Sequence, residues 1–194
     1  MLKSTFLLSA AGAVVLALAS ERAVTRTFDS RPTQSRHLAV WAYRPQDPAQ
    51  MARDVDAVVV ATLADVRPGR VVYASSELGN LSFELHEFVV EQAIKGPGAG
   101  EMLTVERAAG EPPEALTPNH DGGAYVKGRR YLLFLRRQST TPLFYLVHPE
   151  GRYAVADDGV LTAAAEGPVA ALLSKQPLKE VLALLQAAVG VGER

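Results

Sequence analysis

Histidines are the side chains with which to begin a search for chemistry, because they serve as general bases and metal ligands near neutral pH. The chain has four of them, His37, His86, His120 and His148, and no cysteine. No two lie at the spacing of a ligand pair, and there is no H-E-x-x-H pattern. His120-Asp121 lies in a loop, where binding residues concentrate. A metal there would need further ligands such as Asp157 or Glu111, so a solvated loop histidine is the simpler interpretation.

Sequence motifs of other catalytic and nucleotide-binding sites are absent as well. The sequence has no G-x-S-x-G nucleophile elbow, no G-x-x-x-x-G-K-[ST] phosphate loop and no G-x-G-x-x-G dinucleotide loop. The sequence therefore predicts a protein that is not an enzyme, with no catalytic residue, no metal and no cofactor. A hydrolase that uses His120 and Asp121 is the catalytic alternative.

A binding surface is the more promising prediction. The loop of residues 107–123 is rich in Pro and Gly and leads directly to a segment with three cations, GGAYVKGRR. The candidate contact residues are His120, Asp121, Tyr125, Arg129 and Arg130. The two arginines have a simpler interpretation, in which they only solubilise the end of a strand and prevent edge pairing.

The elements that must position these residues are mostly strands. Helical caps at Asp47 and Pro48 predict a short helix that ends near Asp54. Strands are expected at residues 55–66, 71–75, 81–96, 102–106, 131–135, 143–147, 151–155 and 160–161, with a turn at 67–70. Strand 131–135, YLLFL, is apolar on both faces, so it needs a cover on each side.

The pattern of the strand at 81–96 predicts that the sheet closes into a barrel. Its apolar residues lie at odd positions before residue 86 and at even positions after residue 87, and strict alternation permits such a change only with an extra residue. We therefore expect a β-bulge near His86-Glu87, with His86 facing water. Bulged, coiled strands of this length are typical of small closed barrels.

The C-terminal part changes to a helical pattern. Pro168 begins a short helix through Leu173, and a second helix after Pro177 carries one apolar stripe and ends at Gly190. These helices can supply the second cover of strand 131–135. The predicted fold class is mainly β, a small closed antiparallel barrel of about five to six strands with C-terminal α-helices packed on it.

The ordered segments DAVVVAT (56–62), AIKG (93–96), LTV (103–105), GRRYLLFL (128–135), GRYAV (151–155) and DG (158–159) carry a resemblance. Over residues 47–162 the chain resembles bacterial exported proteins with an OB-like barrel similar to the tissue-inhibitor-of-metalloproteinase and netrin modules. The resemblance implies a fold and not an activity. The animal inhibitors chelate a protease zinc with an N-terminal cysteine, and this chain has no cysteine.

The first residues indicate export. Lys3 precedes an apolar run from Phe6 to Ala19, and the Ala17-Leu18-Ala19 sequence suits cleavage after Ala19. An uncleaved N-terminal anchor is the alternative. The predicted organisation is a signal peptide at 1–19, a flexible leader at 20–46, the barrel domain at 47–162 and the C-terminal helices at 163–190. We expect a periplasmic, cell-surface or secreted protein with no membrane span after signal cleavage.

The balance of basic and acidic residues reduces the number of possible functions. Lys+Arg number 20 and Asp+Glu 21, and this balance opposes a dedicated nucleic-acid binder. The sequence therefore predicts a non-catalytic binding or interaction module of the bacterial envelope, whose partner is another envelope or extracellular protein. The alternatives are an inhibitor of an extracellular peptidase, suggested by the resemblance, and a single-strand nucleic-acid binder, a common use of an OB barrel.

Overall fold

The structure is a computed structural model of the chain, and it describes residues 43–75, 79–109 and 124–190. The predicted signal peptide at 1–19, the leader as far as residue 42, and the candidate residues His120 and Asp121 lie outside the described residues. The elements are α2 (Pro48–Asp54), β1 (Ala57–Ser75), β2 (Gly79–Lys95), β3 (Met102–Ala108), β4 (Arg130–Arg137), β5 (Phe144–Leu146), the 3-10 turn η2 (Pro149–Gly151), β6 (Arg152–Val155), β7 (Leu161–Ala163), α3 (Pro168–Leu173) and α4 (Leu178–Gly190).

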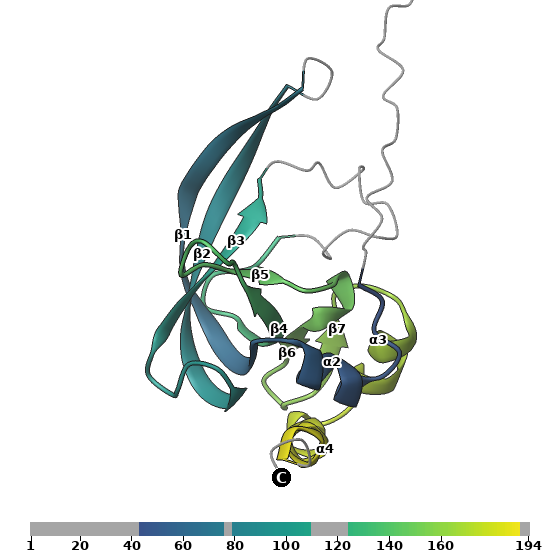
Figure 1. The fold of residues 1–194 in the computed structure, drawn as a ribbon. Coiled ribbons are helices and arrows are strands. Elements are labelled where there is room, and N and C mark those ends of the chain that lie inside the picture. Colours follow the sequence, from purple (N-terminus) through teal and green to yellow (C-terminus); the bar gives the residue numbers. More distant parts are fainter. Residues whose placement is uncertain (1–42, 76–78, 110–123, 191–194) are drawn as a thin grey trace, which may run out of the picture. The chain divides into compact units, whose positions relative to one another are not determined.

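The strands form one sheet of seven, in the order β1-β2-β3-β5-β4-β6-β7 (Figure 1). A further pairing of β1 with β4 brings β1, β2, β3, β5 and β4 into a near-closed ring of five strands. The predicted fold class is therefore confirmed, with one difference. The contact of β3 with β5, at Val105 and Phe144, is parallel, so the sheet is mixed and not purely antiparallel.

Helix α2 begins and ends as its caps predict. Asp47 accepts a hydrogen bond from the Gln50 backbone N–H at 2.7 Å, and Pro48 occupies the first turn, where its missing N–H costs nothing. At the other end of the helix, Lys95 of β2 donates to the carbonyl of Arg53 at 3.0 Å. A cation at the C-terminal carbonyls is favourable for a helix, and it fixes α2 against the end of β2.

The predicted turn at residues 67–70 is wrong, because β1 continues through it to Ser75. Between Pro68 and Val71 the register against β2 shifts by one residue, so the Pro-Gly pair forms a bulge within a long strand. A Cβ on Gly69 would lie 3.0 Å from the Phe83 carbonyl oxygen, which explains why a residue without a side chain stands at this close approach. Beyond the ring, β1 and β2 continue side by side as a long hairpin (Figure 1).

The bulge predicted at His86-Glu87 is also wrong in its position. Strand β2 pairs with β3 in unbroken register from Phe83 to Val89. The extra residue opposite this stretch is Ala64, on β1, and the irregularities of β2 itself fall at Glu91 and Ile94. These shifts move Ile94 to the opposite face of the sheet from Val90. The predicted change from odd to even inward positions near residue 86 does not occur, because Phe88 and Val90 share the inner face with His86, which pairs with the ring-core residue Val105.

Strand β4 is buried on both faces, as its apolar sequence predicts. Tyr131, Leu133 and Leu135 lie inside the ring, whereas Leu132 and Phe134 face the helices. We call the first set of buried residues the ring core: Ala57, Val59, Ala61, Leu63, Phe88, Val90, Leu103, Val105, Tyr125, Tyr131, Leu133, Leu135, Phe144 and Leu146.

The second set is the helix-side core: Met51, Ala52, Val55, Val58, Val60, Leu132, Phe134, Val147, Tyr153, Val155, Leu161, Val169, Leu173, Val181, Leu182 and Leu185. It brings α2, α3 and α4 to one face of the sheet (Figure 1). The apolar stripe of α4 is confirmed by the burial of Val181, Leu182 and Leu185. In the described ranges 43–75, 79–109 and 124–190, no helix has both the length and the apolar character needed to cross a membrane.

Candidate functional site

The approach to β4 places Arg129 and Arg130 at a rim of the sheet. Gly128, at φ +78°, turns the chain into the strand, and its N–H donates to the Leu63 carbonyl at 2.8 Å. The Leu63 N–H in turn donates to the Arg129 carbonyl at 3.1 Å. Both bonds tie the turn to β1, so the arginines extend from a fixed backbone.

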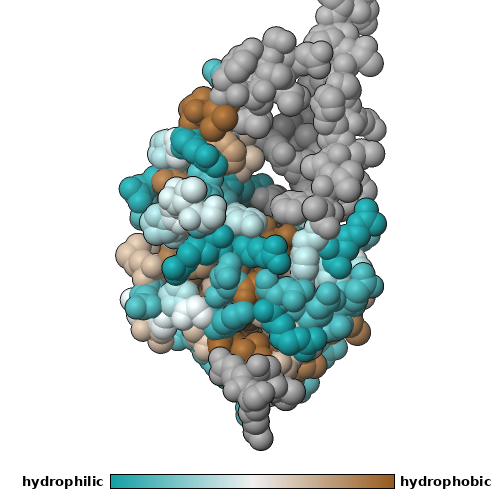
Figure 2. All heavy atoms as spheres, viewed as in Figure 1, coloured by the Kyte–Doolittle hydropathy of each residue, from teal (hydrophilic) through white to brown (hydrophobic). Residues whose placement is uncertain are grey.

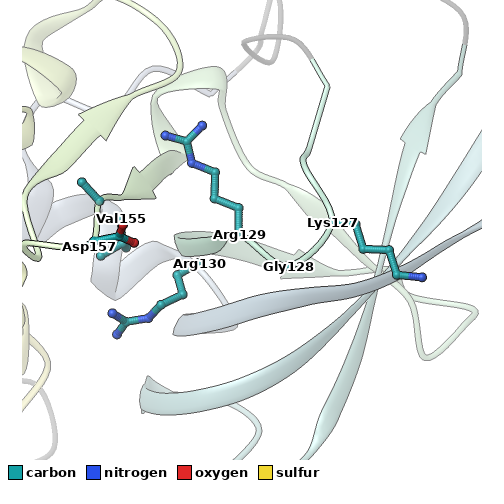
Figure 3. A pocket seen from close by; sticks show the side chains of 7 residues that line it. Lys127, Gly128, Arg129, Arg130, Val155 and Asp157 are labelled. Carbon is teal, nitrogen blue, oxygen red and sulfur yellow. The ribbon is translucent and has the colours of Figure 1, made fainter.

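A depression of about 470 Å³ lies at this rim (Figure 3). It is lined by Lys127, Gly128 and Arg129 from the segment before β4, by Arg130 at its start, and by Val155 at the end of β6 with Ala156 and Asp157 in the turn after it. The two walls meet because Arg130 pairs with Val155 across the sheet. The lining thus combines charged groups at the mouth with the buried side chain of Val155.

Two of the three cations at the rim have acidic partners. Arg130 Nε lies 2.8 Å from Glu91 Oε2, and Lys127 Nζ lies 2.8 Å from Asp65 Oδ1. The hydrogen bond from Lys127, together with one from the Val66 backbone, lowers the pKa of Asp65. Figure 3 shows that the Lys127 side chain points away from the two arginines. Neither group therefore offers a full, uncompensated charge to a ligand.

Arg129 and Asp157 differ from these pairs. Both are exposed, and neither side chain forms an ion pair or a hydrogen bond with another residue of the described ranges. In Figure 3 the Arg129 and Arg130 side chains point to opposite sides, with Asp157 across the depression from them. One positive and one negative group are thus available on facing walls.

The described residues of the predicted binding surface do not all lie at one site. Arg129 and Arg130 line the depression, whereas Tyr125 is 8 % exposed and belongs to the ring core. Its ring packs edge-on against Tyr131 at 5.1 Å between centroids, and the Arg152 guanidinium lies 4.4 Å above it. In the described structure Tyr125 contributes packing beneath the rim, and the rim itself presents the arginines.

His86 corrects a further expectation, because it does not face water. The residue is 2 % exposed, its Nε2 lies 3.6 Å from Glu84 Oε2, and its ring lies 4.9 Å from Tyr125. The pairing of His86 with Val105, a residue of the ring core, turns the histidine to the inner face. Phe88 and Val90, at the next even positions, belong to the ring core as well, and a prediction made from the odd apolar positions missed this face.

The sequence named Asp157 only as a possible metal ligand, it counted Lys127 only as a cation beside the loop, and it missed the two acidic partners, Glu91 and Asp65. Glu91 is 39 positions from Arg130 in the chain, and only the pairing of β1 with both β2 and β4 brings them together. Asp157 had a signal, since its turn follows a predicted strand, but nothing in the sequence indicated that this turn lies beside the start of β4.

Within residues 43–75, 79–109 and 124–190, no three His, Asp or Glu side chains are grouped so that they could hold a metal ion. Comparison of the chain with protein-family models, with curated protein sequences and with solved structures finds no match.

The visible surface offers no competing apolar site on the face drawn in Figure 2. Hydrophilic residues cover most of its described part, and the hydrophobic ones occur in small separate patches. Among the described residues, the most exposed large apolar side chains are Val71, Met102, Leu172 and Val126, which lie on different elements or loops. Scattered exposed apolar residues are normal for a protein surface.

Proposed function

We propose that this protein is a non-catalytic binding module of the bacterial envelope and that it captures another exported protein. The export part of the proposal comes from the signal-like first twenty residues. The lack of cysteine fits a bacterial envelope protein better than a small disulfide-stabilised animal module. The observation that supports a binding role most directly is the depression with Arg129 and Asp157, whose charges have no partner within the described ranges.

The fold supports the same proposal at a finer level. The ring follows the order β1-β2-β3-β5-β4-β1, and we propose that it is an OB-like barrel related to the netrin and metalloproteinase-inhibitor modules. Barrels of this kind bind ligands on a sheet face and the loops beside it. The cysteine-dependent chelation of the animal inhibitors forms no part of the proposal, because the chain lacks cysteine.

Affinity capture tests the proposal. The full chain, immobilised through a tag, is incubated with native envelope extract, and the retained proteins are identified by mass spectrometry. The expected result is a protein retained in stoichiometric amount and released by salt, because rim charges contribute to capture. The same beads carrying urea-unfolded chain are the control. If the folded and the unfolded chain retain the same proteins, the proposed function is wrong.

A further inference from the structure

We propose that the depression receives a carboxylate side chain of the partner on Arg129 and a hydrogen-bond donor of the same partner on Asp157, so that the partner is a polypeptide of mixed charge and not a polyanion. This inference rests on the proposed function and names the chemistry of its contact.

Arg129 is suited to bind a carboxylate. A guanidinium presents a planar fork of donors that matches a carboxylate in two parallel hydrogen bonds. Arg130 and Lys127 already hold the carboxylates of Glu91 and Asp65. Arg129 is the remaining cation of the depression, and its backbone is fixed by bonds to Leu63 and Val126. A fixed backbone lowers the conformational cost of using this side chain in binding.

Asp157 is suited to bind a hydrogen-bond donor and disfavours a polyanion. A chain of phosphates passing through the depression would bring like charges against this carboxylate, which costs binding energy. A donor, such as a lysine or a backbone N–H, would instead pair with it. The turn that carries Asp157 is itself held, since the Ala156 N–H donates to the Val160 carbonyl at 3.0 Å and the Gly159 N–H to the Ala156 carbonyl at 2.9 Å. The negative wall is therefore as fixed as the positive one.

The space between the walls suits side chains. The depression of about 470 Å³ has Val155, Ala156 and Gly128 in its lining, so the methylene stem of a glutamate can pack while its carboxylate reaches Arg129. A Cβ on Gly128 would meet no atom of the described residues within 4 Å, so among these residues the space above Gly128 is open.

The test is an NMR titration of the full chain with a blocked Glu-Ala-Lys peptide, and with a blocked Gln-Ala-Gln peptide as the neutral match. We expect saturable amide shifts at Gly128, Arg129 and Ala156 with the charged peptide only. Arg129→Gln should weaken the affinity by at least about fivefold, because a charge-assisted pair is lost. Asp157→Asn should weaken it less, and Lys179→Gln, on the exposed face of α4, should leave it unchanged.

Two results would overturn the inference. One is an equal response to both peptides, or a response that Arg129→Gln does not alter. The other is tighter binding of an oligothymidylate at the same amides, strengthened by Asp157→Asn, since this would identify a polyanion site. The titration does not require the natural partner, so its failure is separable from a failure of capture. Capture of a partner that Arg129→Gln does not weaken would leave the proposed function in place and remove this contact.

Discussion

The ring core and the helix-side core share strands β1 and β4, but they are enclosed differently. Strands surround the ring core, and its buried Tyr131 hydroxyl accepts a hydrogen bond from the Val126 N–H at 2.7 Å. The helix-side core is closed by helices, and beside it lies the buried carboxylate of Glu150. In that core the Tyr153 hydroxyl forms no hydrogen bond with any described residue.

Glu150 is the polar group on which the helix side depends. Its Oε2 accepts hydrogen bonds from the Val169 and Ala170 N–H groups at 2.7 and 2.9 Å, at the first turn of α3. These donors have no partner within the helix, so a carboxylate there replaces water that burial has excluded. The comparison shows that both cores use polar groups in different ways: the ring core packs Tyr125 against the buried His86 and Arg152, whereas the attachment of α3 depends on one carboxylate that accepts two backbone hydrogen bonds.

The largest expected effects come from the two faces of β4. Phe134→Ala should lower the free energy of unfolding by about 3–5 kcal/mol and Leu133→Ala by about 2–5 kcal/mol, because both side chains are fully buried, one in each core. Urea unfolding of the full chain measures both. Leu184→Ala, at a side chain 49 % exposed on α4, is the control and should be nearly neutral. A cost at either β4 position no larger than that of the control would show that this face is not a core.

Gly167→Ala tests the attachment of α3. The new Cβ would lie 2.2 Å from the Glu150 carboxyl carbon, so the carboxylate must leave its two donors. The expected loss of stability is about 1–3 kcal/mol. In a Glu150→Ala background the same change should cost less, because the clash is gone and the two residues are coupled. A smaller cost should remain in both backgrounds, because Gly167 has φ +157°, a conformation that strains any residue with a Cβ. Equal costs in both backgrounds, measured by urea unfolding, would contradict the role assigned to Glu150.

A matched pair of tyrosines compares the cores at a single hydroxyl. Tyr131→Phe should cost about 0.5–1.5 kcal/mol, since the Val126 N–H loses its acceptor. Tyr153→Phe should be neutral or stabilising by up to about 1 kcal/mol, because it removes a buried hydroxyl without a partner in the described ranges. Thermal unfolding of both variants provides the measurement. A loss of stability in Tyr153→Phe as large as in Tyr131→Phe would mean that the two hydroxyls are equally satisfied.

The smallest expected effect is a dependence on pH at the helix side. Burial lowers the pKa of His148 below its ordinary value of 6.5, although the nearby Glu150 opposes this shift. The folded protein then keeps His148 neutral at pH values where the unfolded chain binds a proton, so stability is full above 6.5 and falls as the pH drops through the folded pKa. Unfolding of the chain and of His148→Asn across this range measures the contribution. A slope that the variant retains would assign it to other groups.

Local signals in the sequence predicted much of this fold. The caps at Asp47 and Pro48, the two-faced apolar run of β4 and the stripe of α4 each report a structure formed by neighbours in the chain, and each is confirmed. Pro68-Gly69 misled because the same dipeptide fits a turn and a bulge, and only the long pairing with β2 decides between them.

The candidate site was less predictable, for a physical reason. Arg129 and Arg130 are adjacent and identical in type, yet Glu91 pairs with Arg130 and no described residue pairs with Arg129. That difference depends on which side chains β2 and β6 bring to the rim. Partners of this kind lie far away in the sequence, and their positions follow only from the register of the complete ring.

Closure of the ring is the central claim, and inter-strand nuclear Overhauser effects test it most directly. The ring requires two junctions, β1 with β4, where Val59 faces Leu133, and β3 with β5, where Val105 faces Phe144. In the full chain we predict backbone cross-peaks at both junctions. Cross-peaks at the first junction without any at the second would reveal an open sheet and contradict the account.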